Sequence, residues 1–175
     1  ATYILNDWVD APADRLHPRK RFRPLAAGTV RVRPALGLAL GLALMALVIS
    51  AVVSWWCLLA VASYLVLMIG YCLSIKHVVI LDVFAIAAGF VLRAVAGAAA
   101  VDVPISAWLL LCTMLLALFL GFGKRRSELV TLQPESLAYR QTLHGYTVPM
   151  LDQAIAVTAA STLMAYATYT FTSAD

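Results

Sequence analysis

Residues 35–53 read ALGLALGLALMALVISAVV, a run of apolar and small side chains without a single charge. Folded as a helix with a rise of 1.5 Å per residue, such a run spans the roughly 30 Å hydrocarbon layer of a membrane. Four more runs of similar length lie at about 56–74, 80–101, 106–123 and 149–172. With 63% hydrophobic and only 13% charged residues, the chain is more apolar than an ordinary soluble domain. We therefore predict an all-α, polytopic transmembrane bundle with five full spans.

The basic residues indicate which links between the spans face the cytoplasm. Two links, around Ser54 and at 102–106, hold neither Lys nor Arg. The alternate links hold the basic residues Arg15, Arg19, Lys20, Arg21, Arg23, Arg31, Arg33, Lys76, Lys124, Arg125, Arg126 and Arg140. Cytoplasmic loops of membrane proteins are enriched in Lys and Arg, so this alternation places the three basic links in the cytoplasm. We expect a multi-pass protein of the cell membrane, without a nucleic-acid partner.

An acidic motif, NDWVDAPAD at 6–14, follows an apolar stub that we interpret as the end of an earlier span. Asn6, Asp10 and Asp14 recur every four residues, which on a helix stacks them on one face, and Asp7 adds a fourth oxygen donor. Stacked carboxylates repel unless a cation neutralises them, and ligation by oxygen alone suits Mg²⁺. The motif therefore predicts a magnesium site; the alternative is a helix cap with solvated surface acids.

A basic stretch, RLHPRKRFRP at 15–24, continues directly from the acidic motif. Carboxylates beside Lys and Arg fit a metal-bound polyphosphate, because the metal and the cations can share the phosphate oxygens. We predict that Lys20 and Arg23 bind phosphate. The alternatives are a positive-inside anchor or a contact with anionic lipid.

The other two cytoplasmic links hold fewer acids. Lys76 and Asp82 flank the beginning of the third span, and GKRRSE at 123–128 follows the fourth. A Lys-Arg pair beside one Glu predicts an anion site with a single acid for a metal or a sugar hydroxyl. We take Lys76, Lys124, Arg125 and Glu128 as substrate-binding candidates; plain positive-inside charge is the alternative.

Arg93 is the basic residue left inside a span. An intramembrane arginine is costly and is by default a functional candidate. It follows Asp82 by eleven residues, about three helical turns, so both side chains lie on one helix face about 16 Å apart along the axis. Arg93 is predicted either to meet a substrate phosphate or to pair with Asp82. The alternative is a structural arginine bound to carbonyls or to a neighbouring helix.

Taken together, these motifs resemble the UbiA superfamily of intramembrane prenyltransferases. The resemblance rests on Asn-Asp-x-x-Asp-x-x-x-Asp at 6–14, followed by Arg-Leu-His-Pro-x-Lys-x-x-Arg-Pro at 15–24. Further matches extend it to about Asp152: 71–76, 82–93, 123–128, 139–140 and 146–147. It implies a fold of nine transmembrane helices around a cavity open to the cytoplasm. Residues 1–175 would form a single membrane domain that runs from the end of the second of those helices to the seventh.

Within the superfamily the sequence is similar to the decaprenyl-phosphate phosphoribosyltransferases of cell-wall arabinan synthesis. Aromatic prenyltransferases of the family carry a second Asp-rich motif where this chain has GKRRSE at 123–128. Basic residues in place of acidic ones at this position favour a donor substrate that carries an extra phosphate group. The resemblance implies a Mg²⁺-dependent transfer of 5-phosphoribose from phosphoribosyl pyrophosphate to a polyprenyl phosphate, with Asp10, Asp14 and Asp82 as catalytic residues. The alternatives are a prenyltransferase with an isoprenyl diphosphate donor, and an inactive membrane remnant.

Overall fold

The computed structural model describes residues 1–16, 20–131 and 145–172, and these residues are almost entirely helical. Two short 3₁₀ helices, η1 (Lys20–Phe22) and η2 (Ile75–His77), lie between the long helices. The α-helices are α1 (Thr2–Leu16), α2 (Val32–Val53), α3 (Trp55–Leu73), α4 (Leu81–Ala100), α5 (Ala107–Thr131) and α7 (Val148–Thr172). No strand occurs in the described ranges, and the prediction of an all-α fold is confirmed.

Five of these helices, α2, α3, α4, α5 and α7, are long and apolar enough to cross a membrane. They coincide with the five apolar runs seen in the sequence. Most of their large apolar side chains are exposed. In α2 only 6% of the most apolar 18-residue stretch is buried within the chain. Surfaces of this kind are normal when the surrounding solvent is lipid rather than water.

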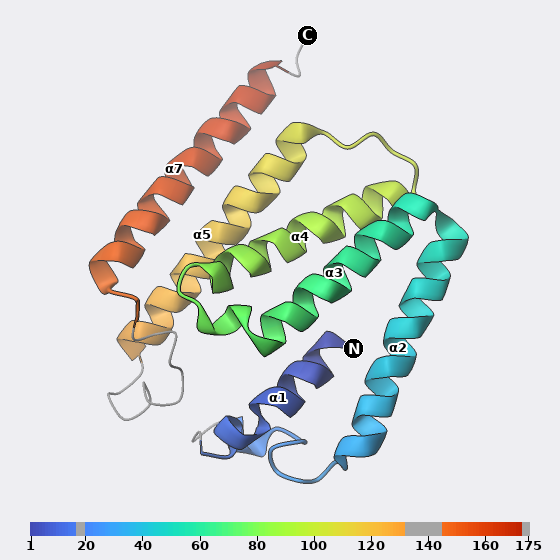
Figure 1. The fold of residues 1–175 in the computed structure, drawn as a ribbon. Helices are drawn as coiled ribbons and strands as arrows, with labels where there is room; N and C mark the ends of the chain where they lie inside the picture. Colours follow the sequence, from blue (N-terminus) through green and yellow to red (C-terminus); the bar gives the residue numbers. More distant parts are fainter. Residues whose placement is uncertain (17–19, 132–144, 173–175) are drawn as a thin grey trace.

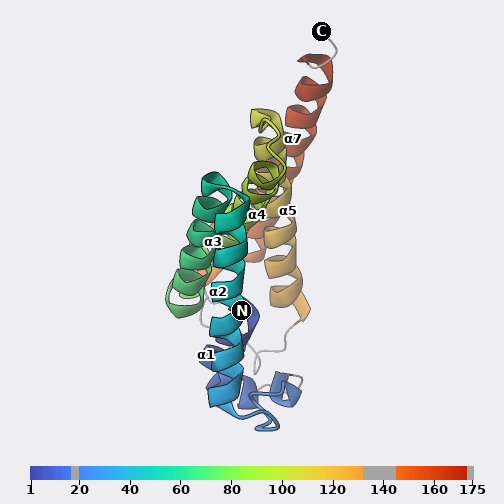
Figure 2. The same ribbon diagram turned by 90° about the vertical axis from the view of Figure 1, so that its right-hand side faces the viewer.

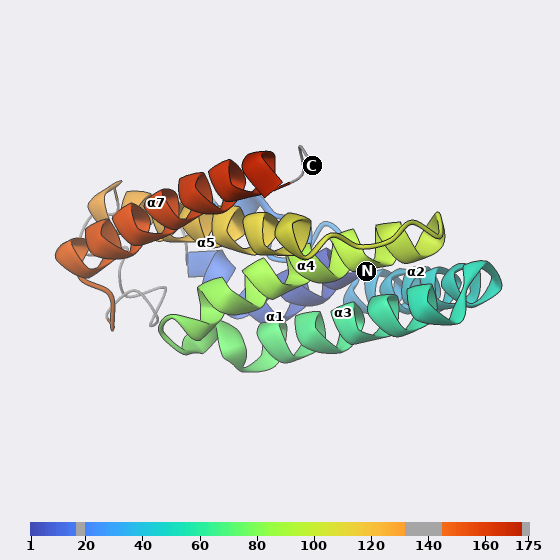
Figure 3. The same ribbon diagram turned by 90° about the horizontal axis from the view of Figure 1, so that it is seen from above.

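Consecutive spans pack side by side, α2 on α3, α3 on α4, α4 on α5 and α5 on α7 (Figure 1). Seen from above, α5 and α7 lie along one side of the molecule and α2 and α3 along the other, with α4 between them (Figure 3). The view turned by 90° about the vertical axis shows α2 in front, with α3 and α5 on either side of it (Figure 2). The shorter helix α1 packs against α2 and α3. This placement brings the acidic motif to the end of the bundle where η2 begins.

The apolar core lies between α4, α5 and the beginning of α7. It consists of Val83, Ala87, Ala117, Leu118, Phe122, Tyr146 and Leu151. Glycine at 121 allows α4 and α5 to approach closely, because a Cβ there would overlap the side chain of Val83. The core therefore sits at the level where α4 begins and α5 ends.

Helix α5 ends later than the sequence suggested. The apolar run ends at about 123, but the helix continues to Thr131, so that the GKRRSE motif is helical rather than part of a link. Lys, Arg and Glu are good helix formers, and Arg125 pairs with Glu128 one turn later. The motif therefore projects its side chains from a rigid helix.

Candidate active site

The acidic motif lies on α1, as its spacing predicts, with Pro12 inside the helix. Asn6 donates a hydrogen bond from Nδ2 to Oδ2 of Asp10 at 3.0 Å, one turn along the same face. Asp14 follows one turn later and is buried. The helix therefore presents a column of oxygen atoms on one face.

Two protein cations lie against this column. Nη1 of Arg23, just after η1, donates to Oδ1 of Asp7 at 3.0 Å and to Oδ2 of Asp14 at 2.8 Å. The ammonium of Lys76, in η2, lies 2.5 Å from Oδ1 of Asp10. We call Asp7, Asp10, Asp14, Arg23 and Lys76 the motif cluster. All three of its carboxylates have a cationic partner.

The cluster fits Mg²⁺ by its chemistry, since its donors are carboxylate and amide oxygens. Within the residues that the structure describes, however, no three Asp, Glu, His or Cys side chains are grouped closely enough to hold an ion. Arg23 joins Asp7 to Asp14, whereas Asp10 bonds Asn6 and Lys76. A metal bound to this face would therefore take the place of these cations on the carboxylates.

A second polar group lies in the core, away from solvent. Asp82, Arg125 and Tyr146 are only 0%, 2% and 3% exposed. Nε of Arg125 donates to Oδ2 of Asp82 at 2.6 Å, and Nη1 donates to Oε2 of Glu128 at 2.9 Å. The hydroxyl of Tyr146 donates to Oδ1 of Asp82 at 2.5 Å. We call Asp82, Arg125, Glu128 and Tyr146 the sealed cluster.

The sealed cluster changes how two predicted site residues are understood. Asp82 and Arg125 were expected to contact substrate, but they lie buried against each other, with both Asp82 oxygens hydrogen-bonded. No buried side-chain nitrogen or oxygen in the described part of the chain lacks a hydrogen-bond partner. Lys124, next to Arg125, is exposed. Of the Lys-Arg pair, Lys124 is thus the one that a ligand can reach directly.

Tyr146 titrates differently from an exposed tyrosine. Burial, together with its hydrogen bond to Asp82, raises the pKa of its hydroxyl well above the ordinary value. The phenol is therefore neutral at physiological pH and can serve as a hydrogen-bond donor to the carboxylate.

Arg93 does not pair with Asp82, which was one of the two roles predicted for it. Its Nη2 donates to the Tyr64 hydroxyl at 2.5 Å, and its guanidinium lies 4.9 Å and 5.3 Å from the ring centroids of Tyr64 and Phe90. Asp82 has Arg125 as its partner instead. The arginine is held between α3 and α4 by hydrogen bonding and cation–π contacts.

Two residues of this region were not predicted from sequence as site residues. Tyr64 sits in an apolar span, and its contact with Arg93 crosses from one helix to another, which no local spacing reveals. Tyr146 falls in the stretch at 146–147 that resembles the family, but no role in the site was predicted for it. Its partners Ile80 and Asp82 lie more than sixty positions earlier in the chain.

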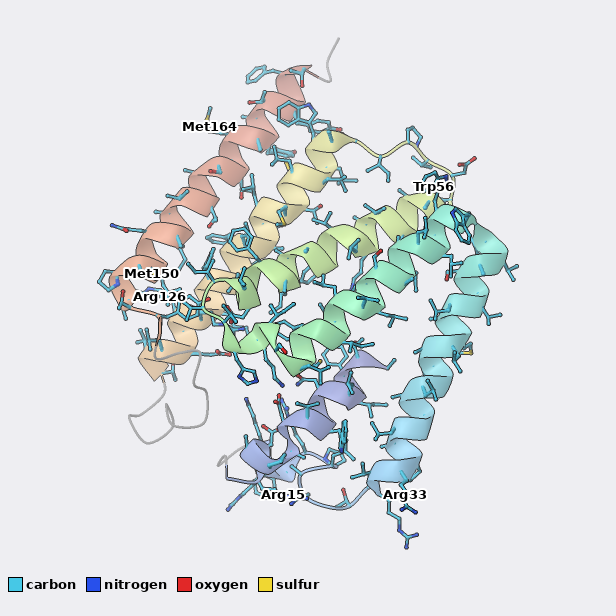
Figure 4. The ribbon with its side chains drawn as sticks, viewed as in Figure 1. Arg15, Arg33, Trp56, Arg126, Met150 and Met164 are labelled. Atoms are coloured by element: carbon cyan, nitrogen blue, oxygen red, sulfur yellow. The ribbon has the colours of Figure 1, made fainter. Side chains whose placement is uncertain are left out.

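The basic residues gather at one end of the bundle. Arg15, Arg33 and Arg126 lie toward the end that holds the acidic motif, and Trp56 lies at the opposite end (Figure 4). Arg15 donates from Nε to the carbonyl oxygen of Ala26 at 3.2 Å, which fixes the segment after η1 to α1. The distribution agrees with the alternation seen in the sequence.

A sequence profile of the UbiA prenyltransferase family matches residues 1–127. The chain belongs to the UbiA prenyltransferase family. Among curated UbiA relatives, it is 38% identical to the decaprenyl-phosphate phosphoribosyltransferase of Mycolicibacterium smegmatis, over 97% of this chain and 53% of that protein. It is 36% identical to the enzyme of that name from Corynebacterium glutamicum, over 98% of this chain and 52% of the relative. The counterpart from Mycobacterium tuberculosis is 33% identical, over 98% of this chain and 57% of that protein.

The fold of a solved UbiA protein is similar as well. The structure of a UbiA homolog from Archaeoglobus fulgidus bound to DMAPP and Mg²⁺ superposes with a TM-score of 0.80. The match covers 95% of this chain and 60% of that one, at 19% sequence identity. The chain thus has the UbiA fold, and it spans about half the length of the curated relatives it matches.

Proposed function

We propose that the protein to which this chain belongs transfers 5-phosphoribose from phosphoribosyl pyrophosphate to a polyprenyl phosphate, with release of diphosphate. The observation that carries the proposal is the 33–38% identity to decaprenyl-phosphate phosphoribosyltransferases along nearly the whole chain. The GKRRSE motif on α5 supports it, because it places the exposed Lys124 where aromatic prenyltransferases of the family carry a second Asp-rich motif.

The motif cluster would bind the diphosphate end of the donor. Asn6, Asp7, Asp10 and Asp14 are the proposed ligands of Mg²⁺, which would neutralise negative charge on the leaving diphosphate. Arg23 and Lys76 already lie on these carboxylates, so either could turn to a phosphate oxygen when the metal takes its place. Lys20, in η1, is a further proposed phosphate ligand.

Residues of α5 would bind the rest of the donor substrate, its 5-phosphate and its ribose. Lys124 is exposed beside the sealed cluster and is the proposed ligand of the 5-phosphate. Glu128, which is partly exposed and paired with Arg125, is the proposed contact of a ribose hydroxyl. Asp82 and Arg125 would act by holding Glu128 and the beginning of α4 in place. Arg93, which is exposed on α4 and hydrogen-bonded to Tyr64, is the proposed contact of the acceptor phosphate.

The reaction would exchange one oxygen for another at the ribosyl carbon. The bond from that carbon to the diphosphate oxygen breaks, and the electron pair leaves with the diphosphate. A bond to an oxygen of the lipid phosphate forms as positive charge develops on the ring. The chain's part is to hold both anions in line and stabilise the departing charge, which can supply most of the rate enhancement. By the positive-inside rule, this chemistry would occur at the cytoplasmic face of the cell membrane.

The match to the prenyltransferase family model supports a second candidate, transfer of an isoprenyl group to another acceptor. Label transfer by the full-length protein in lipid separates the two. The proposal predicts that label from phosphoribosyl pyrophosphate enters a lipid phosphate in a Mg²⁺-dependent reaction. Transfer of label from an isoprenyl diphosphate alone would refute it.

A further inference from the structure

The connection between η2 and α4 contains an unusual turn at Ile80. This residue has φ 71° and ψ −49°, and the amide of Leu81 donates to the carbonyl oxygen of Val79 at 2.8 Å. These values describe a γ-turn of the rare, strained type with positive φ. A β-branched residue with positive φ is an outlier that persists only when its surroundings hold it there.

The hydroxyl of Tyr146 is placed to hold this turn. It accepts a hydrogen bond from the amide of Ile80 at 2.7 Å and donates one to Oδ1 of Asp82 at 2.5 Å. One buried phenol therefore ties down both the centre of the turn and the first turn of α4. Asp82 is itself fixed on its other side by Arg125.

Backbone packing around Tyr146 supports the same contact. Gly145 lies directly against Val79, and a Cβ at this position would overlap the Val79 side chain. The segment that precedes α7 is thus pressed onto the residues that form the turn.

The turn lies four residues after Lys76, whose ammonium pairs with Asp10. Between the end of η2 and Ile80 there are only Val78 and Val79, and the carbonyl oxygen of Val78 accepts from the amide of Asp82. A connection this short transmits the position of Ile80 to η2. Hence the position of Lys76 depends on the turn that Tyr146 holds.

We infer that Tyr146 is a positioning residue for Lys76: its hydroxyl holds the Ile80 turn and thereby sets the ammonium against the acidic face of α1. The inference rests on the proposed function in one respect, the binding of diphosphate by the motif cluster. It adds that the segment before α7, far from that cluster in the sequence, controls the affinity for diphosphate.

The test is a double-mutant cycle on the full-length protein in lipid, with inorganic diphosphate and Mg²⁺ as the probe and calorimetry as the readout. Lys76→Met should weaken diphosphate binding by about tenfold, the effect of losing one charge-assisted hydrogen bond. Tyr146→Phe keeps the aromatic ring and should weaken diphosphate binding by roughly fivefold. The double variant should bind no more weakly than Lys76→Met alone, because both changes act through the same ammonium.

A purely structural role for Tyr146 would give a different pattern of diphosphate affinities in the double-mutant cycle. If the fold-losses of diphosphate affinity caused by Tyr146→Phe and by Lys76→Met multiplied in full in the double variant, the inference would be wrong. Binding as tight as wild type in either single variant would overturn it equally. The exposed Tyr166 on α7 supplies the matched control, since Tyr166→Phe should leave diphosphate binding unchanged.

A second variant covers the case in which Tyr146→Phe does not fold. Gly145→Ala removes no hydrogen bond but pushes on Val79, and it should weaken diphosphate binding only while Lys76 is present. Gly41→Ala is its control, because a Cβ there meets no atom within 4 Å. Full additivity of Gly145→Ala with Lys76→Met would refute the inference. Diphosphate binding does not depend on the group transferred, so failure here is distinguishable from failure of phosphoribosyl transfer by the wild type.

Discussion

The motif cluster and the sealed cluster use the same chemistry, carboxylates paired with basic side chains, in opposite surroundings. In the motif cluster the side chains of Asp7 and Asp10 are 32% and 31% exposed, although Asp14 is buried. In the sealed cluster Asp82 is 0% exposed and hydrogen-bonded on both oxygens. In the proposed function the first exchanges its protein cations for a metal and phosphate, whereas the buried Asp82–Arg125 pair of the second is closed to ligands.

This difference separates binding from support within one polar end of the bundle. Ion pairs near solvent contribute little to stability, so their loss should be felt mainly in ligand binding. Buried ion pairs are strongly destabilising when one partner is removed, because a charge is left without compensation. Substitutions in the two clusters should therefore produce different kinds of defect.

The largest effect is expected at Asp10. Asp10→Asn removes a carboxylate from the centre of the acidic face, and Mg²⁺-dependent transfer by the full-length protein should fall by about a thousandfold. The helical fold should survive, as judged by circular dichroism and elution from a sizing column. Full activity in this variant would refute the metal-binding role.

The next effect should be on stability rather than on ligand binding. Asp82→Asn leaves the buried Arg125 paired with Glu128 alone, and the free energy of unfolding should drop by about 3 kcal/mol. Thermal unfolding in detergent measures this loss. If Asp82→Asn melted like the wild type and lost only turnover, the sealed cluster would be catalytic rather than supporting.

A smaller effect is expected at Arg23, which is partly exposed and bridges the partly exposed Asp7 and the buried Asp14. Because Asp14 is buried and loses this cation, Arg23→Gln should lower the free energy of unfolding by about 1–3 kcal/mol, less than Asp82→Asn. It should raise the KM for the diphosphate donor several-fold, because a phosphate contact is lost. A large fall in melting temperature with an unchanged KM would contradict the comparison.

Tyr146 predicts a pH dependence. Its folded-state pKa lies above the unfolded value near 10, so its contribution to stability is complete below about pH 10 and declines as the pH rises further. Wild type should therefore be more stable than Tyr146→Phe at pH 8, and the difference in melting temperature should shrink above pH 10. If the difference in melting temperature stayed constant from pH 8 to pH 11, the protonated Tyr146 hydroxyl would not be the source of the stabilisation.

The smallest effect is expected at Arg126, which pairs with Asp152 on the surface between α5 and α7. Both side chains are well exposed, so Arg126→Gln should change neither melting temperature nor transfer measurably. This variant is the control for removing an arginine from the end of α5. A marked loss of stability would show that exposure does not separate the two kinds of ion pair.

Much of the fold was predictable because a membrane requires long apolar helices. The runs at 35–53 and 56–74 needed no tertiary information, and neither did the one-face spacing of Asn6, Asp10 and Asp14. The polar end of α5 was not predicted, since apolarity marks where lipid ends and not where a helix ends. Lys124 and Arg125 are neighbours in sequence, yet one is exposed and the other buried, which only packing against α4 decides.

The contacts of the two tyrosines were beyond sequence reasoning for a related reason. Tyr146 meets Ile80 and Asp82, and Tyr64 meets Arg93, across helices that only the folded bundle brings together. An alternation of polar and apolar residues cannot show which neighbour a side chain will reach. The pairing of Arg93 with Asp82 failed for the same reason: a shared helix face does not imply a shared partner.

In the proposed mechanism the acidic face of α1 binds a divalent metal together with diphosphate once its protein cations are displaced. Electron paramagnetic resonance of Mn²⁺ bound to the full-length protein, with and without inorganic diphosphate, tests this directly. Mn²⁺ should bind weakly to the wild type alone and at least about tenfold more tightly with diphosphate, and Asp10→Asn should lose this gain. Equal Mn²⁺ binding with and without diphosphate, or an undiminished gain in Asp10→Asn, would contradict the account.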